Sequence, residues 1–424
     1  MPRRVAITGL GAVTPVGNTV ESTWQALLAG RSGIGPITSF DATTFPVRIA
    51  GMVKDFDVDA YVPDRNVRRH LSRAAGFGVA ATREALNDAG ISSDTYEPYE
   101  KGVSLGGSVG RADLQELADM SYQIKSTDMH ELFRQDPAGV VLRDQNAGAA
   151  QMAMVGDCQG PMISVSTACS AAAHALGEGF RWIQDGQAKL MIAGGYDSLT
   201  TWMDVLGFSL LGALATEFND NPEKASRPFD KERSGFVLGE GAVVAVLEDW
   251  ESAQARGARI LAELVGYGSS LNAYRITDAP PDGGGQMLAM NSALKDSGLT
   301  TDDVDYVVAH GTGTPGNDAC ETTALKGVFG QDAYRLAISS PKSMTGHLTC
   351  AAGSLNLLAA VCAIRDQVVS PTINYQVPDP HLDLDYVPNQ KRQMRVRAAL
   401  VNAFAFGGTN ASLVVREANG STGG

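Results

Sequence analysis

Two segments of this sequence follow the same pattern: a short apolar strand, a tight loop of small residues and an alanine-rich helix. One covers residues 163–173 and contains Cys169, and the other covers residues 338–353 and contains His347. Repetition of one structural unit within a chain predicts two related halves. Each helix carries almost no charge over its first three turns, so both are expected to be buried and to form a layer shared between sheets.

The rest of the chain alternates β-rich apolar runs with helical patterns, which predicts an α/β fold. Helices are expected at residues 74–89 and 252–256, and strands at residues 5–8, 102–105, 162–165, 190–193, 242–247, 304–309, 398–401 and 412–415. We interpret the polar stretch at residues 111–160 as an insertion that covers a pocket or meets a partner subunit. The 424 residues divide into halves 1–255 and 256–424, which are expected to form one compact unit.

Composition narrows the class of protein. The formal net charge of −13 argues against general nucleic-acid binding, which depends on a basic surface. The five cysteines form no CxxC pair and no regular disulfide framework, so a cytoplasmic location is expected. No apolar run approaches the roughly 18 to 20 residues that span a bilayer, so neither a signal peptide nor a membrane anchor is expected.

Cys169 is the first candidate for chemistry because it stands where a buried strand turns sharply into a helix. The positive end of the helix dipole and free N–H groups favour a thiolate at such a position. Taken alone, an unpaired cysteine among small residues more often reflects inert core packing.

Two of the six histidines stand in positions that complement such a cysteine. His310 ends an apolar strand and opens the glycine-rich loop 311–315, at the edge where α/β proteins commonly bind ligands. His347 precedes the second buried helix. A cysteine nucleophile needs a base or an electrostatic partner, and its acyl intermediate needs hydrogen-bond donors for the oxyanion. Together, Cys169, His310 and His347 predict nucleophilic acyl chemistry.

Two other kinds of site are rejected. The HxxC spacing of His347 and Cys350, with Cys320 elsewhere, lacks the second ligand pair of a zinc site, so no metal is expected. The glycine-containing segment 9–17 lacks the GxGxxG spacing of a dinucleotide site, and Pro15 interrupts its turn.

With Lys342 and the segment 402–410, NAFAFGGTN, also in view, the chain resembles the elongating β-ketoacyl-acyl carrier protein synthases over nearly its whole length. Residues 221–230, 235–241 and 272–274 are most similar to the ketosynthase subunit of type II polyketide synthases, although fatty-acid condensing enzymes share much of this pattern. The resemblance implies a thiolase-like fold, in which two similar halves stack as five alternating α and β layers.

The resemblance also implies a reaction: decarboxylative Claisen condensation of malonyl-carrier protein with a cysteine-bound acyl chain. The expected setting is aromatic or polyene polyketide biosynthesis, and the alternative is a fatty-acid elongating 3-oxoacyl-acyl carrier protein synthase II. The enzyme itself is expected to bind no cofactor, because its substrates are carried on the phosphopantetheine of an acyl carrier protein.

A role for each site residue follows from the same resemblance. Cys169 takes the acyl chain, His310 and His347 assist decarboxylation, and Lys342, paired with Glu321, holds the histidines electrostatically. The backbone N–H groups of Cys169 and Phe406 form the oxyanion hole. The other implied roles are phosphopantetheine binding by Thr312 and Thr314, gating by Phe404, Ala405 and Phe406, acyl-pocket lining by Val109, and carrier-protein docking by Arg65, Arg68, Arg69 and Arg73.

The sequence departs from the family pattern at three places. Ala405 stands where fatty-acid enzymes usually carry glycine, which alters gating if the loop must adopt a positive φ. The loop 314–318 and the run after Cys169 differ from those of aromatic polyketide subunits, so the type of product stays open.

Relatives imply a homodimer, or a heterodimer with a chain-length-factor-like homologue that lacks the cysteine. Three other classes were considered: a thiolase, a starter-type synthase with a Cys-His-Asn set, and a non-catalytic homologue. The lysine-to-histidine segment 342–347 argues against the first two, and the presence of Cys169 argues against the third.

Overall fold

The computed structural model describes residues 2–108, 121–122, 125 and 145–418, and the main sheet in this part of the chain has ten strands. Their order is β10-β9-β13-β14-β8-β1-β7-β6-β4-β5. The strands are β1 (Val5–Val13), β4 (Lys101–Gly107), β5 (Met162–Val165), β6 (Leu190–Ser198), β7 (Glu240–Asp249), β8 (Ala262–Leu271), β9 (Tyr306–Val308), β10 (Ala337–Ser339), β13 (Ala398–Phe404) and β14 (Thr409–Arg416).

The directions of the strands repeat from one edge of the sheet to the other. β4 lies between β5 and β6 and is parallel to both, just as β9 is parallel to β10 and β13. The other neighbouring pairs are antiparallel. The two five-stranded parts join where β1 meets β8, between Val5 and Ile7 on one strand and Ala262 and Leu264 on the other. The prediction of an α/β chain with two related halves is confirmed.

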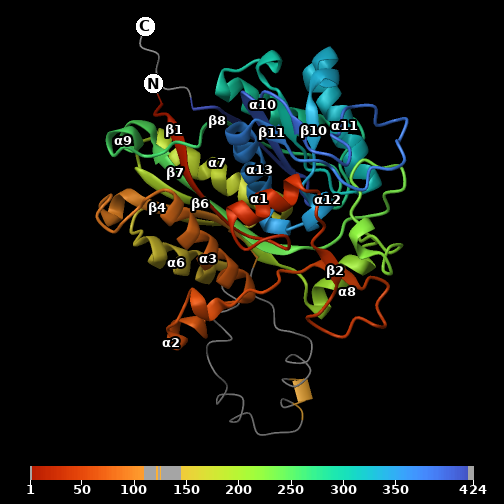
Figure 1. The fold of residues 1–424 in the computed structure, drawn as a ribbon, viewed down its shortest axis with the longest axis horizontal. Helices are drawn as coiled ribbons and strands as arrows, with labels where there is room; N and C mark the ends of the chain where they lie inside the picture. The colour runs from red at the N-terminus through yellow and green to blue at the C-terminus, as the bar shows by residue number, and fades with distance from the viewer. Residues whose placement is uncertain (1, 109–120, 123–124, 126–144, 419–424) are drawn as a thin grey trace.

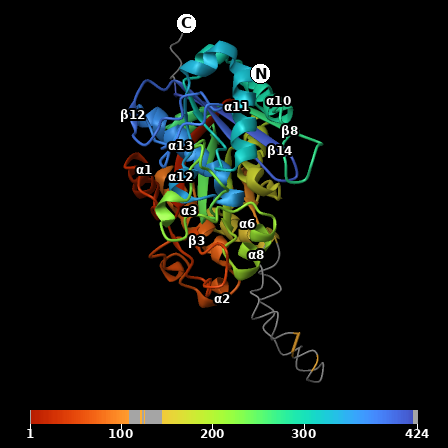
Figure 2. The same cartoon turned by 90° about the vertical axis from the view of Figure 1, so that its right-hand side faces the viewer.

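Helices cover the two parts of the sheet and also separate them. α3 (Arg73–Asp88) packs on β1, β6 and β7, with α6 (Gln145–Gly156) beside it. α10 (Gly284–Ser297) packs on β8, β13 and β14, with α11 (Pro315–Phe329) beside it. Figures 1 and 2 both show α10 and α11 at the opposite end of the molecule from α3 and α6.

The central layer consists of α7 (Ala171–Gln184) and α13 (Ala352–Asp366), which contact each other and strands of both halves. Every residue of α13 from Ala352 to Ile364 is buried. The two helices approach closely: a Cβ on Gly353 would lie 2.7 Å from the backbone nitrogen of Ala173. Small side chains therefore let the two helices fit between the two five-stranded parts of the sheet, and with the outer helices they give the five alternating layers that were expected.

The turns that lead into these two helices have the same backbone geometry. Ala168 has a φ of 48° and Thr349 a φ of 46°, and each begins one turn of 3-10 helix before the α-helix. Cys169 and Cys350 are therefore the equivalent residues of the two halves, a correspondence that the sequence comparison did not identify. We call residues 167–170 the cysteine turn and residues 347–351 the histidine turn.

Smaller elements complete the described chain. They are α1 (Val20–Leu28), β2 (Ile34–Pro36), β3 (Ile49–Gly51), α2 (Arg65–Arg68), α8 (Trp202–Leu210), α9 (Trp250–Ala255), α12 (Lys342–Thr345), β11 (Val368–Val369) and β12 (Arg392–Gln393). The expected helices at 74–89 and 252–256 correspond to α3 and α9. Most of the expected insertion at 111–160 lies outside the described residues, and the division of the chain at residue 255 stays a prediction. Within the described part, no helix is long and apolar enough to cross a membrane.

Candidate active site

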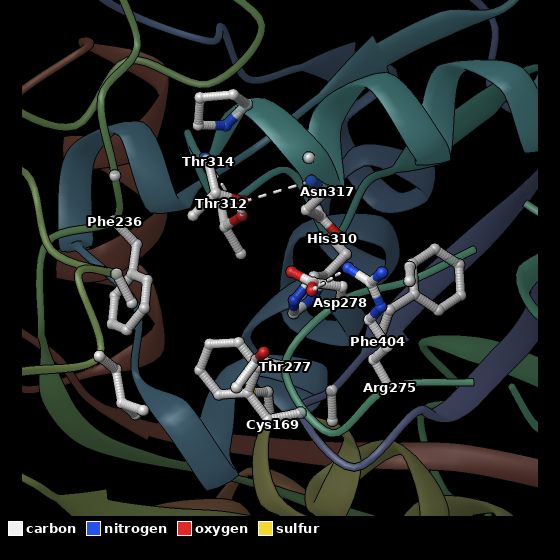
Figure 3. A pocket seen from close by; sticks show the side chains of 18 of the residues that line it. Cys169, Phe236, Arg275, Thr277, Asp278, His310, Thr312, Thr314, Asn317 and Phe404 are labelled. Carbon is white, nitrogen blue, oxygen red and sulfur yellow. Dashed lines mark hydrogen bonds and ion pairs between the residues drawn. The ribbon is translucent and has the colours of Figure 1, made fainter. Parts of the chain in front are cut away.

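A cavity of about 520 Å³ brings side chains of both halves together. Cys169 comes from the first half, and His310, His347 and Phe404 come from the second. Figure 3 shows Thr312 and Thr314 at the end of this cavity away from Cys169. Residues that stand far apart in the sequence therefore share one cavity, which is where the resemblance required them to be.

Cys169 is partly buried in the cysteine turn. Burial raises the pKa of its thiol to about 11, and the negative charge of Asp197 adds to that effect. The positive charge of Lys342 and the backbone N–H groups of Phe406 and Cys169 itself act in the opposite direction. The N–H groups therefore act in favour of the thiolate, and burial has the larger effect on the pKa of Cys169. Both N–H groups nevertheless lie close enough to act on the sulfur, and an acyl oxygen bound there would meet the same donors.

His347 is held as one tautomer. Its Nδ1 accepts a hydrogen bond of 3.2 Å from the backbone N–H of Thr349. A neutral imidazole that accepts at Nδ1 carries its proton on Nε2. Burial, and then the charge of Lys342, lower the pKa of His347 well below its ordinary value, so the ring is neutral near pH 7. Its Nε2 has no partner among the described residues, so the Nε2–H group is available to a substrate in the cavity.

His310 lies opposite His347, with ring centroids 5.4 Å apart and planes at 79° to each other. Burial lowers the pKa of His310 well below its ordinary value, and the positive charge of Lys342 and the neighbouring imidazole of His347 act in the same direction. Two neutral imidazoles beside a buried thiol can donate hydrogen bonds to a substrate without adding positive charge.

Lys342 and Glu321 do not form the direct pair that was expected. Glu321 accepts hydrogen bonds of 2.9 Å from the backbone N–H groups of His310 and Gly311, and one of 3.1 Å from Asn402 Nδ2. Lys342 Nζ is buried and has no hydrogen-bond partner among the residues that the structure describes. Burial lowers the pKa of Lys342 to about 8, and the charge of Glu321 opposes this shift. The two groups act on each other through space because Glu321 is already used to hold the loop that begins at His310.

Thr312 and Thr314 lie on the loop that leads into α11. Their hydroxyl oxygens are 3.0 Å apart, and the Thr314 hydroxyl caps α11 by accepting from the backbone N–H of Asn317. Asp318 is fully buried, and its Oδ1 accepts hydrogen bonds from the backbone N–H groups of Thr312 at 3.1 Å and Gly313 at 3.2 Å. Burial raises the pKa of this carboxyl. Asp318 therefore holds the backbone of the loop whose threonines line the cavity.

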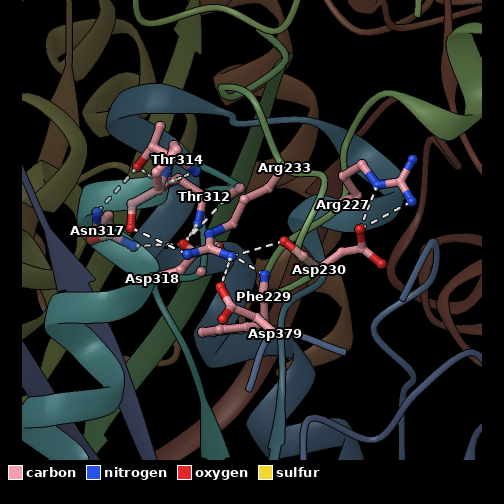
Figure 4. Close-up of polar contacts among 12 residues, drawn as sticks. Arg227, Phe229, Asp230, Arg233, Thr312, Thr314, Asn317, Asp318 and Asp379 are labelled. Atoms are coloured by element: carbon pink, nitrogen blue, oxygen red, sulfur yellow. Dashed lines mark hydrogen bonds and ion pairs between the residues drawn. The ribbon is translucent and has the colours of Figure 1, made fainter. Parts of the chain in front are cut away.

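Arg233 supports the same loop through its contact with Asp318 (Figure 4). Its Nε lies 3.7 Å from Asp318 Oδ2, and its Nη1 donates a hydrogen bond of 2.7 Å to Asp379. The backbone N–H of Phe229 completes the set by donating to Asp318 Oδ2 at 2.8 Å. These contacts connect the segment before β7 to the start of α11.

The segment that was expected to form the gate begins at Phe404, the last residue of β13. Phe404, Ala405 and Phe406 all line the cavity, and Gly407 and Gly408 after them have φ values of 84° and 78°. Ala405 is not among the non-glycine residues with a positive φ. An alanine therefore fits this conformation without strain, and the positive φ values fall on the two glycines instead.

The four arginines proposed for docking line a second cavity of about 440 Å³, near α2 and the start of α3. Arg73 is ion-paired with the buried carboxylate of Glu240 at 2.6 Å, and Arg68 with Asp59 at 2.9 Å. Arg73 is therefore part of the fold, whereas Arg65 and Arg69 are exposed. Val109, the expected acyl-pocket residue, lies outside the described residues.

Three buried polar residues at the site were missed in the sequence. Asp197 lies beneath the histidine turn, Asn402 donates to Glu321, and Asn356 Nδ2 donates to the carbonyls of Ala309 and Asn402, both at 3.0 Å. Each is a polar residue within an otherwise apolar strand or helix, and that signal could have identified them. In the described part of the chain, no group of three or more His, Cys, Asp or Glu side chains is arranged to hold a metal ion.

Known proteins match this chain along most of its length. The family model "Beta-ketoacyl synthase, N-terminal domain" matches residues 2–253, and "Beta-ketoacyl synthase, C-terminal domain" matches residues 261–376. The chain therefore belongs to the beta-ketoacyl synthase family, a class of condensing acyltransferases with the thiolase-like fold.

Individual relatives refine this assignment. The 3-oxoacyl-[acyl-carrier-protein] synthase 2 of Synechocystis sp. is 44% identical over 415 residues, which cover 98% of both chains. A solved complex of a type II polyketide synthase acyl-carrier protein with its ketosynthase, AntDE:AntF, contains a chain with a TM-score of 0.89 and 33% identity, with 98% of this chain and 100% of that chain covered. The ishigamide ketosynthase/chain length factor gives a TM-score of 0.87 and 34% identity, with 99% and 100% covered.

The comparisons shift the balance between the two settings raised by the sequence. The polyketide ketosynthase was favoured there, with a fatty-acid elongating 3-oxoacyl-acyl carrier protein synthase II as the alternative. The higher identity belongs to a 3-oxoacyl-[acyl-carrier-protein] synthase 2, and the solved polyketide structures share less of the sequence. Both kinds of relative are beta-ketoacyl-acyl carrier protein synthases. Of the two settings, the fatty-acid synthase II is better supported than the polyketide ketosynthase.

Proposed function

We propose that this protein is a 3-oxoacyl-acyl carrier protein synthase that elongates fatty-acyl chains. The observation that carries this proposal is the cavity in which a buried Cys169 thiol, two backbone N–H donors and two neutral histidines lie together. Such a set of groups serves acyl transfer through a covalent thioester.

In the first step, Cys169 Sγ attacks the thioester carbonyl of an acyl-carrier protein. The C–S bond to phosphopantetheine breaks, and the departing thiol takes up the proton that Cys169 releases. The negative charge on the tetrahedral oxygen is stabilised by the N–H groups of Cys169 and Phe406, which already act on the sulfur in the free protein. Lys342 favours loss of the thiol proton because its positive charge lowers the pKa of Cys169.

In the second step, the malonyl group of a second carrier protein loses its carboxylate as CO2. The electrons of the broken C–C bond pass into an enolate, and its thioester oxygen accepts hydrogen bonds from His347 Nε2–H and from His310. The enolate carbon then attacks the acyl thioester on Cys169, the C–S bond to Cys169 breaks, and the departing thiolate takes up a proton from water to restore the Cys169 thiol. The product is a 3-oxoacyl thioester that is two carbons longer. Neither step is an oxidation or a reduction, so the reaction needs no redox cofactor.

The other site residues position the substrates. Thr312 and Thr314 present hydroxyls at the far end of the cavity, where a phosphopantetheine arm can accept and donate hydrogen bonds. Glu321 fixes the loop that begins at His310 and acts electrostatically on Lys342. Phe404, Ala405 and Phe406 form the gate between the acyl chain and the malonyl group.

The proposed partner is an acyl carrier protein. Carrier proteins are acidic and this chain carries a formal net charge of −13, so docking requires a local basic surface. Arg65, Arg68 and Arg69 supply it, and Arg73 supports it through Glu240. We further propose a dimer in the cytoplasm, formed by two copies of this chain or by this chain and a chain-length-factor-like homologue.

Intact-mass measurement tests the reaction directly. We expect the protein incubated with acyl-carrier protein to gain one acyl group, and the addition of malonyl-carrier protein to give a product two carbons longer. Cys169→Ala should remove both signals. Cys350→Ala, which changes the equivalent cysteine of the other half, should keep the adduct. Elongation by Cys169→Ala would exclude the mechanism.

A type II polyketide ketosynthase is the second candidate, supported by the likeness to the AntDE and ishigamide structures. The same assay separates the two. A fatty-acid synthase of this kind elongates saturated acyl chains by itself, whereas a polyketide ketosynthase produces poly-β-keto chains and needs a cysteine-lacking homologue. Elongation only in the presence of such a homologue would favour the polyketide function.

A further inference from the structure

Asp197, at the end of β6, is a fully buried carboxylate to which the proposed mechanism assigns no role. Its Oδ2 accepts a hydrogen bond of 2.9 Å from the backbone N–H of Cys350 and a second one from the Thr349 hydroxyl. Its Oδ1 accepts from the backbone N–H of Ser198 at 2.9 Å and from the hydroxyl of Ser108. Four donors converge on one side chain, and two of them belong to the histidine turn.

The backbone of the histidine turn needs such support. Thr349 has a φ of 46°, in the left-handed region that a β-branched residue rarely adopts. A residue in this region costs on the order of 1–3 kcal/mol and persists only where its surroundings hold it. Asp197 receives both the side-chain hydroxyl of Thr349 and the next N–H along the chain, so it holds the turn on both sides of the strained residue.

Thr349 also orients His347. The N–H of Thr349 donates to His347 Nδ1, and this bond places the remaining imidazole proton on Nε2, facing the cavity. If the turn were released from its contacts with Asp197, the backbone of Thr349 could shift and its N–H would no longer be held against His347 Nδ1. A chain of contacts therefore runs from Asp197 through Thr349 to the group that meets the substrate.

We propose that Asp197 is a positioning residue for decarboxylation: its carboxylate holds the histidine turn so that His347 presents Nε2–H to the malonyl thioester. The proposal rests on the proposed function, because it assigns the position of a histidine that acts in that reaction. It concerns the second step alone, since the attack by Cys169 does not use His347.

The nearby thiol supplies an internal reference. The negative charge of Asp197 raises the pKa of Cys169, so its removal should make Cys169 easier to ionise. Loss of the carboxylate should therefore slow decarboxylation and leave alkylation of Cys169 as fast as in the wild type or faster. A general loss of structure would also expose the thiol and speed alkylation, so the midpoint of chemical denaturation is measured for each variant beside the two rates.

The experiment compares Asp197→Asn with Glu248→Gln in the full-length protein. Glu248 is also fully buried and accepts hydrogen bonds from Thr8, Tyr96 and Arg256, but it touches no residue of the cavity. Two rates are measured for each: conversion of malonyl-carrier protein to acetyl-carrier protein, and alkylation of Cys169 by iodoacetamide, followed by intact mass.

We expect Asp197→Asn to lower the decarboxylation rate by about 10²-fold, as a misplacement of the order of 1 Å can do. Its alkylation rate should not fall, and Glu248→Gln should keep decarboxylation within about threefold of wild type. Equal rates of decarboxylation in Asp197→Asn and wild type, or a parallel loss of decarboxylation and alkylation, would overturn the proposal. A wild-type protein that decarboxylates nothing would instead contradict the proposed function.

A second pair of variants covers the case in which Asp197→Asn does not fold. Thr349→Val removes the hydroxyl that donates to Asp197 and keeps the β-branched shape, whereas Thr349→Ser keeps the hydroxyl. Decarboxylation should fall in Thr349→Val by about tenfold, in line with one lost hydrogen bond to a charged group, and should be retained in Thr349→Ser. Equal activity of the two variants would overturn the proposal as well.

Discussion

The cysteine turn and the histidine turn have the same backbone conformation, but the cysteine of the first lies at the cavity and that of the second is buried. Both contain a left-handed residue, Ala168 or Thr349, followed by a cysteine and a buried helix. In the first, the sulfur of Cys169 lies at the cavity and meets the N–H groups of two residues. In the second, Cys350 is buried, and its N–H is taken by Asp197.

The difference indicates that the backbone conformation of the turn alone does not distinguish Cys169 from Cys350. What distinguishes Cys169 is the set of side chains from the other half of the chain that lie around it. The cysteine turn is completed by Phe406, His310 and His347, which all come from the second half of the chain. The histidine turn is completed by Asp197 from the first half. Each half therefore supplies the groups that make the turn of the other half functional.

The variant with the largest expected effect on this comparison is His347→Ala. It removes the proton donor of the histidine turn and leaves the cysteine turn unchanged. We expect malonyl decarboxylation to fall by about 10²- to 10⁴-fold, the usual contribution of a positioned proton donor or acceptor. Acylation of Cys169, followed by intact mass, should stay within about threefold of wild type. A parallel loss of both steps would mean that the two turns do not act separately.

A smaller effect is expected where the two central helices touch. In Gly353→Ala, the new Cβ would lie 2.7 Å from the backbone nitrogen of Ala173 and 2.9 Å from its Cβ. Such overpacking should lower the free energy of unfolding by about 1–3 kcal/mol. Chemical denaturation measures this change.

Gly207→Ala in α8 is the matched control, because a Cβ there meets nothing within 4 Å. Removing glycine from a helix interior should raise the free energy of unfolding by about 0.5–1 kcal/mol. If both variants had the same stability, close contact between the halves would not be what requires glycine at position 353.

The pH dependence of stability tests whether the histidine turn is buried, because burial lowers the pKa of His347 and so weakens its proton binding in the folded protein. The pKa of His347 is well below its ordinary value in the folded protein, whereas in the unfolded chain it is about 6.5. Above pH 6.5 neither state is protonated at this residue, and below it only the unfolded state is. This residue should therefore lower the free energy of unfolding as the pH falls below 6.5, with a slope that approaches about 1.4 kcal/mol per pH unit.

His347→Asn removes this dependence, so its stability relative to wild type should improve by about 1 kcal/mol between pH 6.5 and 5.5 in denaturant titrations. His381→Asn, which changes an exposed histidine, provides the control and should keep the wild-type slope. Identical slopes for wild type and His347→Asn would show that the ring is not buried in its neutral form.

The smallest effect is expected at the gate. Ala405 has no positive φ, so Ala405→Gly relieves no strain and should change the rate of elongation by less than about threefold. Steady-state kinetics with acyl-carrier proteins of increasing length would detect a larger change. A gain of tenfold or more for long chains would mean that the gate passes through a backbone conformation that alanine resists.

Much of the fold could be predicted from the sequence because its pattern is regular. The uncharged helices after Cys169 and His347, and the apolar strands before them, indicated two related halves, and the structure confirms them. The equivalence of Cys169 and Cys350 was not visible, since it depends on the positive φ of the preceding residue rather than on residue type.

The sequence was sufficient to predict which residues form the site, but not which contacts these residues make. The sequence named Cys169, His310 and His347, and all three line one cavity. It gave no reason to expect that Glu321 would be used by backbone N–H groups rather than by Lys342, because backbone donors carry no sequence signal. The net effect on the pKa of Cys169 also required the structure, since burial outweighs the helix start there.

The division of the site between the halves has a consequence for how the enzyme is synthesised. A ribosome completes Cys169 well before His310 and His347, and it adds Phe406 close to the C-terminal end of the chain. At a rate of about 5–20 residues per second, the interval between Cys169 and Phe406 is on the order of 10 to 50 s. During this time the thiol exists without the N–H group of Phe406 and, at first, without the two histidines. Nascent chains, and fragments that end before Phe406, therefore contain the proposed nucleophile without the full set of groups that the proposed condensation requires.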